Sequence, residues 1–285
     1  MESRKYYSQR QAGSLGKINL DDFKEIFQSI YSDFRSRGYF DEYLGQLCVD
    51  GDSPGKAGSN IEGYVLRKLR KKGLWPISET YKYYSEGDLF DIIEFLFDHV
   101  SKPLEIGSWY HTWSDCGYHY VNFDKFIGES EFRSELNQFL NDYGAGHELS
   151  ERGEILTLLE PEFRPLLEAS IPTEDKENIE ERIKNATDKY RKYAATFVER
   201  KEAVRALADC LEYLRPELKT VFMSSDESDL FNIINNFGIR HHNTKQKTNY
   251  DENIWLSLMF YFYLATIHAA LRLIRREKMV GATPP

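Results

Sequence analysis

Apolar residues recur at helical spacing through much of the second half of the chain, and this periodicity limits the fold more than any other feature. The pattern consists of Ile179, Ile183, Ala186, Tyr190, Phe197, Val204, Leu207, Leu211 and Leu214. One helix of about 40 residues would be roughly 60 Å long, so we expect a break near Glu199 to Glu202. Thr173, which follows Pro172 and precedes two acidic residues, predicts the start of the first helix.

Two more helices are predicted after this pair. Asp229 to Phe237 forms a short apolar segment, and a long final helix is expected from near Asn249 to about Lys278. Within it, Ile254 to Ile274 is apolar enough to consider as a membrane span. Polar residues interrupt that segment, and its aromatic residues lie along the middle instead of at the ends. We therefore expect a buried core helix, no membrane contact, and an up-and-down helical bundle over residues 173–280.

The first half also predicts a mainly α fold, in a separate domain over residues 18–165 that follows a flexible polar tail at 1–17. Helices are expected from Leu20 to Gly38 with Asn19 as N-cap, and over Asn60–Lys72, Leu89–Val100 and Phe132–Tyr143. Alternation around Arg152-Gly153 predicts a small β-hairpin, which we expect to be the only sheet. Residues 107–127 are aromatic and show no regular period.

Composition restricts the function classes. The chain has 285 residues, is 41% hydrophobic and 29% charged, and has a net charge of -9, which is typical of a soluble globular protein. A broad nucleic-acid-coating surface is therefore not expected, and any such contact must come from local basic patches, such as Arg67 to Lys72 or the region of Arg240. Three widely spaced cysteines and a polar N-terminus without a signal peptide predict a cytoplasmic location.

The sequence Arg240-His241-His242-Asn243 lies in a polar, basic segment before the predicted final helix. Arginine binds phosphate through two parallel hydrogen bonds, and histidine transfers protons near neutral pH. A helix start adds free N–H groups that favour phosphate. We infer a metal-free phosphodiester-cleaving site that selects RNA, since only RNA carries the 2′-hydroxyl nucleophile. The candidate catalytic residues are Arg240, His241 and His242, and the candidate RNA-binding residues are Asn243, Lys245 and Lys247. The alternative is a helix-capping segment in which Arg240 pairs with an acidic residue.

The segment His111 to His119 contains His111, Cys116 and His119 at metal-compatible spacing. His99 or His147 would complete a tetrahedral set. The alternative, which we favour from sequence, is ordinary packing of an aromatic loop, because a single spacing of this kind often occurs without a metal.

Three stretches resemble the N-terminal domain of bacterial AbiJ-like abortive-infection proteins. They are Gly73-Leu74-Trp75-Pro76-Ile77, Asp91 to Leu96 with Val100 to Pro103, and the series from Phe132 through Glu148 to Ile155. The C-terminal half resembles HEPN domains in Phe237 to Asn243, in the aromatic segment from Trp255 to Thr266, and in its helix count.

The resemblance implies a phage-defence protein whose C-terminal domain is a metal-independent endoribonuclease without a cofactor, with its centre at a homodimer interface. Arg240 matches the family arginine and His241 the polar position after it. Lys245, Gln246 and Lys247 occupy the window in which the family histidine lies, with His242 as the substitute. The alternative is therefore a non-catalytic RNA- or protein-binding regulatory module. An antitoxin or a phage trigger protein is a further partner that the resemblance implies, with the N-terminal domain as sensor.

Overall fold

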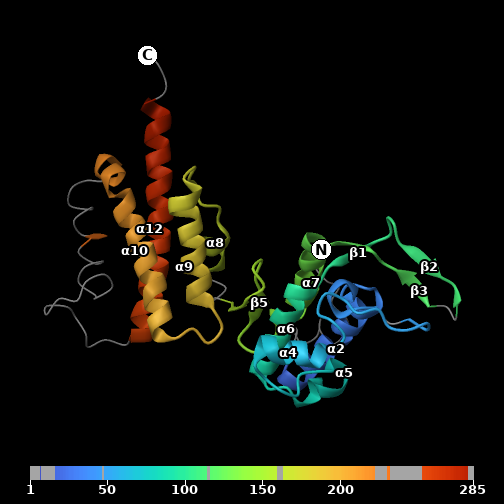
Figure 1. The fold of residues 1–285 in the computed structure, drawn as a ribbon. Helices are drawn as coiled ribbons and strands as arrows, with labels where there is room; N and C mark the ends of the chain where they lie inside the picture. Colours follow the sequence, from blue (N-terminus) through green and yellow to red (C-terminus); the bar gives the residue numbers. More distant parts are fainter. Residues whose placement is uncertain are drawn as a thin grey trace. The chain divides into compact units, whose positions relative to one another are not determined.

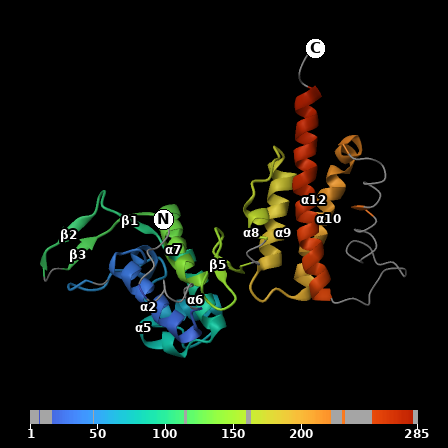
Figure 2. The same ribbon diagram turned by 180° about the vertical axis from the view of Figure 1, so that it is seen from behind.

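The computed structural model describes residues 7, 17–46, 48–113, 116–158, 163–221, 230–231 and 252–281, and the chain divides into two compact units between Leu158 and Leu159. Both units are mainly helical (Figures 1 and 2), which confirms the predicted fold class. Each unit has its own core, so the two are described separately.

The N-terminal unit is built from helices around an aromatic and aliphatic core. They are α2 (Leu20–Ser36), α3 (Asp41–Leu44), α4 (Ile61–Leu69), α5 (Ile77–Thr80), the 3-10 helix η1 (Tyr81–Tyr83), α6 (Glu86–His99) and α7 (Lys125–Leu140). The core includes Phe23, Phe27, Phe34, Leu89, Ile93, Leu96, Phe132 and Leu136. The predicted cap of α2 is confirmed, since the Asn19 side chain accepts a hydrogen bond from the Asp22 N–H at 2.9 Å.

Helix α7 begins at Lys125, earlier than the apolar period starting at Phe132 predicts. The Asp124 carboxylate accepts a hydrogen bond from the Ile127 N–H at 2.9 Å and caps the first turn. Gly128 lies directly against the backbone of Ser101, where a Cβ atom would be only 2.7 Å from the Ser101 Cα. The additional first turns of α7 thus pack on the chain that leaves α6.

Three two-stranded antiparallel ladders belong to the N-terminal unit. They are β1 (Lys102–Leu104) with β4 (Asn122–Asp124), β2 (Trp109–His111) with β3 (Gly117–His119), and β5 (His147–Leu149) with β6 (Ile155–Thr157). The last is the predicted hairpin, but the expectation that it would be the only sheet is wrong. Strands of three residues with aromatic side chains on both faces produce no apolar–polar alternation, so residues 107–127 carried no strand signal. The β2–β3 hairpin projects from the helices of this unit (Figure 1).

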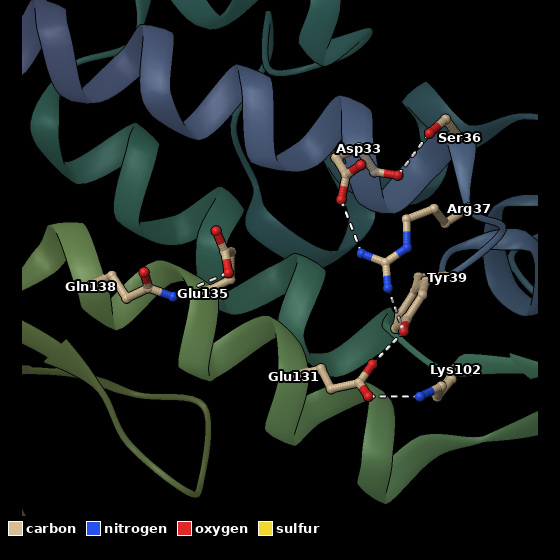
Figure 3. Close-up of polar contacts among 8 residues, drawn as sticks. All are labelled: Asp33, Ser36, Arg37, Tyr39, Lys102, Glu131, Glu135 and Gln138. Atoms are coloured by element: carbon tan, nitrogen blue, oxygen red, sulfur yellow. Dashed lines mark hydrogen bonds and ion pairs between the residues drawn. The ribbon is translucent and has the colours of Figure 1, made fainter. Parts of the chain in front are cut away.

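A network of polar side chains connects the end of α2 with α7 and β1 (Figure 3). The Arg37 guanidinium donates to the Asp33 carboxylate and to the Tyr39 hydroxyl, both at 3.0 Å. Tyr39 in turn donates to Glu131, which also accepts a hydrogen bond from Lys102 at 2.7 Å. Burial and the bond to Glu131 raise the pKa of Tyr39 to about 12, so the hydroxyl keeps its proton and remains a donor.

The C-terminal unit contains α8 (Arg164–Glu168), a short π-helix η3 (Lys176–Glu180), α9 (Glu181–Arg191), α10 (Phe197–Val221) and α12 (Glu252–Gly281). Asp175 caps η3 by accepting from the Asn178 N–H at 3.0 Å, two residues after the predicted start. The break in the long apolar stripe lies between α9 and α10, before the predicted position. It lies there because Thr196 and Glu199 cap α10 reciprocally, the Thr196 hydroxyl accepting from the Glu199 N–H.

Helix α12 packs along α10 in the core of this unit, and both views show α9, α10 and α12 side by side (Figures 1 and 2). Its buried residues include Leu256, Met259, Phe260, Tyr263, Leu264, Ile267 and Leu271. Within the described chain, Ile254–Met279 is the one helix long and apolar enough to cross a membrane, and 56% of its most apolar window is buried inside the protein. That burial is what a core helix requires.

Candidate metal centre

The predicted ribonuclease residues Arg240, His241, His242, Asn243, Lys245 and Lys247 lie outside the described residues. Among the residues that the structure does describe, one group of side chains has the composition and spacing of a metal site. It consists of Cys48, His111, Cys116 and His119, all in the N-terminal unit, and we call it the Cys2His2 cluster.

The β2–β3 hairpin positions three of the four side chains. In its register Trp109 lies opposite His119 and His111 lies opposite Gly117. Residues two apart in a strand point to the same face of the ladder, so His111 on β2 and His119 on β3 share one face with Trp109. Cys116 directly precedes β3, in a turn closed by a 3.1 Å hydrogen bond from its N–H to the Trp113 carbonyl.

Cys48 comes from a separate loop, between α3 and α4. Gln46 and Ser53 exchange two backbone hydrogen bonds of 2.9 Å, which close the loop around Cys48. The Gln46 side chain also donates to the Tyr120 carbonyl at 2.9 Å, one residue after β3. These bonds hold the Cys48 loop beside the hairpin.

Two sulfur–nitrogen distances within the cluster match those of a tetrahedral zinc site. Its four possible ligand atoms all lie within 4.8 Å of one another. Cys48 Sγ is 3.6 Å from His111 Nδ1, and Cys116 Sγ is 3.4 Å from His119 Nε2. Zinc–sulfur bonds of about 2.3 Å and zinc–nitrogen bonds of about 2.0–2.1 Å, at tetrahedral angles, give a sulfur–nitrogen separation of about 3.6 Å.

Asp50 supports two of the ligands. Its carboxylate lies 3.3 Å from His111 Nε2, the ring nitrogen that does not face Cys48. Its backbone N–H donates to Cys48 Sγ at 3.4 Å. A carboxylate on the far nitrogen of a histidine fixes the tautomer that presents the other nitrogen to a metal, so Asp50 orients His111 for coordination through Nδ1.

Trp109 supports a third ligand. Its indole stacks on the His119 ring at a centroid distance of 4.4 Å and an interplanar angle of 11°. His119 is 8% exposed, whereas Cys48, His111 and Cys116 are partly exposed. The Trp109 indole therefore covers the His119 side of the cluster, and the cysteine side is accessible to small solutes.

The two sulfurs influence each other. The Asp50 N–H by itself lowers the pKa of Cys48, but loss of solvation and the neighbouring Cys116 sulfur outweigh it and leave that pKa raised. Two thiolates side by side repel each other, and a divalent cation between them removes this repulsion and displaces both protons.

His99 and His147, the predicted candidates for completing the site, do not belong to the cluster. His99 Nδ1 donates to the Phe95 carbonyl at 2.6 Å, and its Nε2 accepts from the Tyr64 hydroxyl at 2.8 Å. The His147 ring packs on Phe90 at 5.2 Å. Burial lowers the pKa of both histidines, so each is a neutral core residue.

The fourth residue of the cluster is Cys48, and not His99 or His147 as predicted from the sequence. A cysteine 63 residues before His111 has no local spacing that marks it as a ligand. The one sequence signal is its position in Cys48-Val49-Asp50-Gly51, since Gly51 has a φ of 120° and closes a tight turn. Such a turn directs a backbone N–H toward a sulfur.

Comparison with known proteins assigns the chain to no family. No family model matches it, no curated protein matches significantly, and no solved structure matches significantly.

Proposed function

We propose that the N-terminal unit binds one zinc ion through Cys48, His111, Cys116 and His119. The observation that carries the proposal is the convergence of four ligand atoms within 4.8 Å of one another. Two sulfurs and two imidazole nitrogens favour zinc, because magnesium and calcium require oxygen ligands.

The zinc ion has a structural role. Four protein ligands fill a tetrahedral site and leave no open position for water or substrate, as is typical of structural zinc centres. The ion would join the Cys48 loop to the β2–β3 hairpin, whose strands have only three residues each. A two-stranded ladder of this size is not stable alone, so the metal supplies the missing stabilisation.

The test is the metal content of the full-length protein purified from cells supplied with zinc, by elemental mass spectrometry. We expect about one zinc per chain, and loss of most of it in Cys116→Ser and His119→Ala. Cobalt replacement gives a second readout: tetrahedral ligand-field bands together with thiolate-to-cobalt charge-transfer absorption. Zinc-free protein that also binds no cobalt would overturn the proposal.

Tyr118→Phe provides a matched control. Tyr118 lies in the chain between Cys116 and His119. Its side chain faces the opposite side of the ladder and contacts Tyr110. A ligand variant whose whole N-terminal unit misfolds would show altered circular dichroism in the helical region, whereas loss of the ion alone would not.

A second function is proposed for the C-terminal unit, as an endoribonuclease of a phage-defence system or, as the alternative, a non-catalytic RNA- or protein-binding module. It is supported by the Arg240-His241-His242-Asn243 sequence shortly before α12 and by the helical core of α9, α10 and α12. Arg240 would bind phosphate while His241 or His242 transfers the proton. Homodimer formation through this unit belongs to the same proposal.

This second function is tested by incubating total RNA with the purified protein in the presence of a chelator. Cleavage that persists with chelator and disappears in Arg240→Ala supports the ribonuclease. A Lys72→Ala variant, which removes a charge from the other basic patch, serves as control. Intact RNA with wild-type protein, together with equal growth toxicity of wild type and Arg240→Ala, would eliminate the nuclease.

A further inference from the structure

The two cysteines of the Cys2His2 cluster are close enough to react with each other. Cys48 Sγ and Cys116 Sγ are among the four atoms that lie within 4.8 Å of one another, and both side chains are partly exposed. A disulfide requires the sulfurs to approach to about 2.0 Å, so the two segments that carry them must move closer together. Both residues lie outside the helices of the unit, so this movement does not require the helical core to rearrange.

We infer that Cys48 and Cys116 form an oxidation site, at which a hydroperoxide converts the zinc-binding pair into a disulfide and releases the ion. This inference rests on the proposed zinc site. The cluster combines three features that favour such chemistry: thiolates held deprotonated by a cation, a path for a small oxidant, and a second sulfur placed to resolve the first product.

The reaction balances as follows. One cysteine thiolate attacks an oxygen of the hydroperoxide, the O–O bond breaks, and the products are a sulfenic acid and, after protonation, an alcohol or water. The second thiolate attacks the sulfenic sulfur, the S–S bond forms, and hydroxide leaves as water after protonation. Two electrons pass from the two sulfurs to the peroxide, and two protons are consumed. Zinc keeps only His111 and His119 as ligands, too few to hold it in a tetrahedral protein site.

Cys210 is an internal control. It lies in the core of the C-terminal unit with no exposed surface, and burial raises the pKa of its thiol to about 11. A thiol that is neither exposed nor ionised reacts slowly with peroxides. One wild-type chain therefore contains a reactive pair and an unreactive reference.

The experiment uses zinc-loaded wild-type protein treated with hydrogen peroxide. A chromogenic chelator follows zinc release, and digestion without reductant followed by mass spectrometry identifies the linked peptides. We expect one zinc released per Cys48–Cys116 disulfide, with Cys210 still open to alkylation after unfolding, and recovery of zinc binding after dithiothreitol and zinc are added.

Cys116→Ser separates the two steps. This variant has no resolving sulfur and little zinc, so we expect no intramolecular disulfide, and dimedone should trap as a sulfenic acid the Cys48 that does react. Three outcomes would overturn the inference: zinc retained with both thiols reduced, oxidation to sulfinic acid without a disulfide, or a disulfide that links two chains.

The starting zinc content distinguishes the two proposals. A protein that carries no zinc before treatment and takes up neither zinc nor cobalt contradicts the zinc site, whatever the sulfurs then do. A protein that carries one zinc and fails to form the intramolecular disulfide contradicts only the oxidation site.

Discussion

The Asp50 carboxylate lies 3.3 Å from Nε2 of His111, on the opposite side of the ring from Cys48. Removal of such a carboxylate typically reduces metal affinity by about 10–100-fold. We expect Asp50→Ala to weaken zinc binding within this range, and Asp50→Asn to weaken it less, because an amide oxygen still accepts the Nε2 proton. Competition with a zinc-binding dye measures the affinities. Glu62→Gln, which removes an exposed charge on α4, should bind zinc like wild type, and equal affinity in all four proteins would contradict the role of Asp50.

Zinc removal should loosen only one region of the N-terminal unit. The proposed ion would join residues 46–53 to the β2–β3 hairpin, whereas the core residues of α2, α6 and α7 pack on one another independently of that site. We expect hydrogen exchange, followed by mass spectrometry, to increase in peptides covering 46–53 and 109–119 after chelation and to remain slow in the three helices. Faster exchange throughout the unit would show that the metal is needed for the whole fold.

Tyr39→Phe removes a hydroxyl from the network of Figure 3. The Tyr39 hydroxyl donates to Glu131 and accepts from Arg37, so its loss leaves both charged groups with one partner fewer. A hydrogen bond to a charged group contributes roughly 1.5–3 kcal/mol. Because Glu131 keeps its bond to Lys102, we expect a loss near the lower end of this range. Urea unfolding measures it, and unchanged stability would mean that solvent replaces the hydroxyl without loss.

Gly153 lies in the β5–β6 turn at a φ of 80°, against the Phe97 ring of α6. An added Cβ atom would be 2.8 Å from the ring Cε1, and Phe97 is buried and has little room to move. We expect Gly153→Ala to destabilise the unit by about 2–5 kcal/mol, the sum of left-handed strain and overpacking.

Gly144→Ala is the matched control for that substitution. Gly144 also has a positive φ, of 56°, but its Cβ would be 3.9 Å from its nearest neighbour, on the His147 ring. It should therefore cost only the backbone strain of about 1–2 kcal/mol. Thermal unfolding that ranks the two variants equally would contradict the close contact with Phe97.

The C-terminal unit should lose stability on the acid side of neutral pH. Burial, and secondarily the charge of Arg272, lower the pKa of His268 from its ordinary value of 6.5. As the pH falls below 6.5 the unfolded chain takes up this proton first, so the contribution is neutral above pH 6.5 and destabilising below it. Hydrogen exchange of α10 and α12 at pH 7.5 and 5.5 measures the effect, and His268→Leu should show a smaller difference than wild type. Identical differences would contradict it.

Local signals predicted much of the fold. The Asn19 cap, the apolar periods of α2, α6 and α12, and the β5–β6 hairpin all depend on residues close in sequence. The β1–β4 and β2–β3 ladders could not be predicted from the local sequence, because each strand is only three residues long and depends on its partner strand. The break between α9 and α10 was predicted too late in the chain, because it is marked by the Thr–Glu capping pair that begins α10 and not by a gap in the apolar pattern.

The candidate site, too, was predicted only where its residues are close in sequence. The spacing of His111, Cys116 and His119 was visible in the sequence because one hairpin carries all three. The fourth ligand was assigned to His99 or His147, since neither their burial nor the approach of the Cys48 loop can be inferred without the fold. The function of Arg240 to Lys247 remains a prediction from sequence.

The separation of 63 residues between Cys48 and His111 affects when the proposed ion could be acquired during synthesis. A ribosome releases Cys48 well before Cys116 and His119, and until then the nascent chain offers a single thiolate that competes poorly with cellular chelators. Capture of the proposed ion would therefore wait until the ligands of the hairpin have also left the ribosome, and a chain truncated before Cys116 should leave the ribosome without zinc.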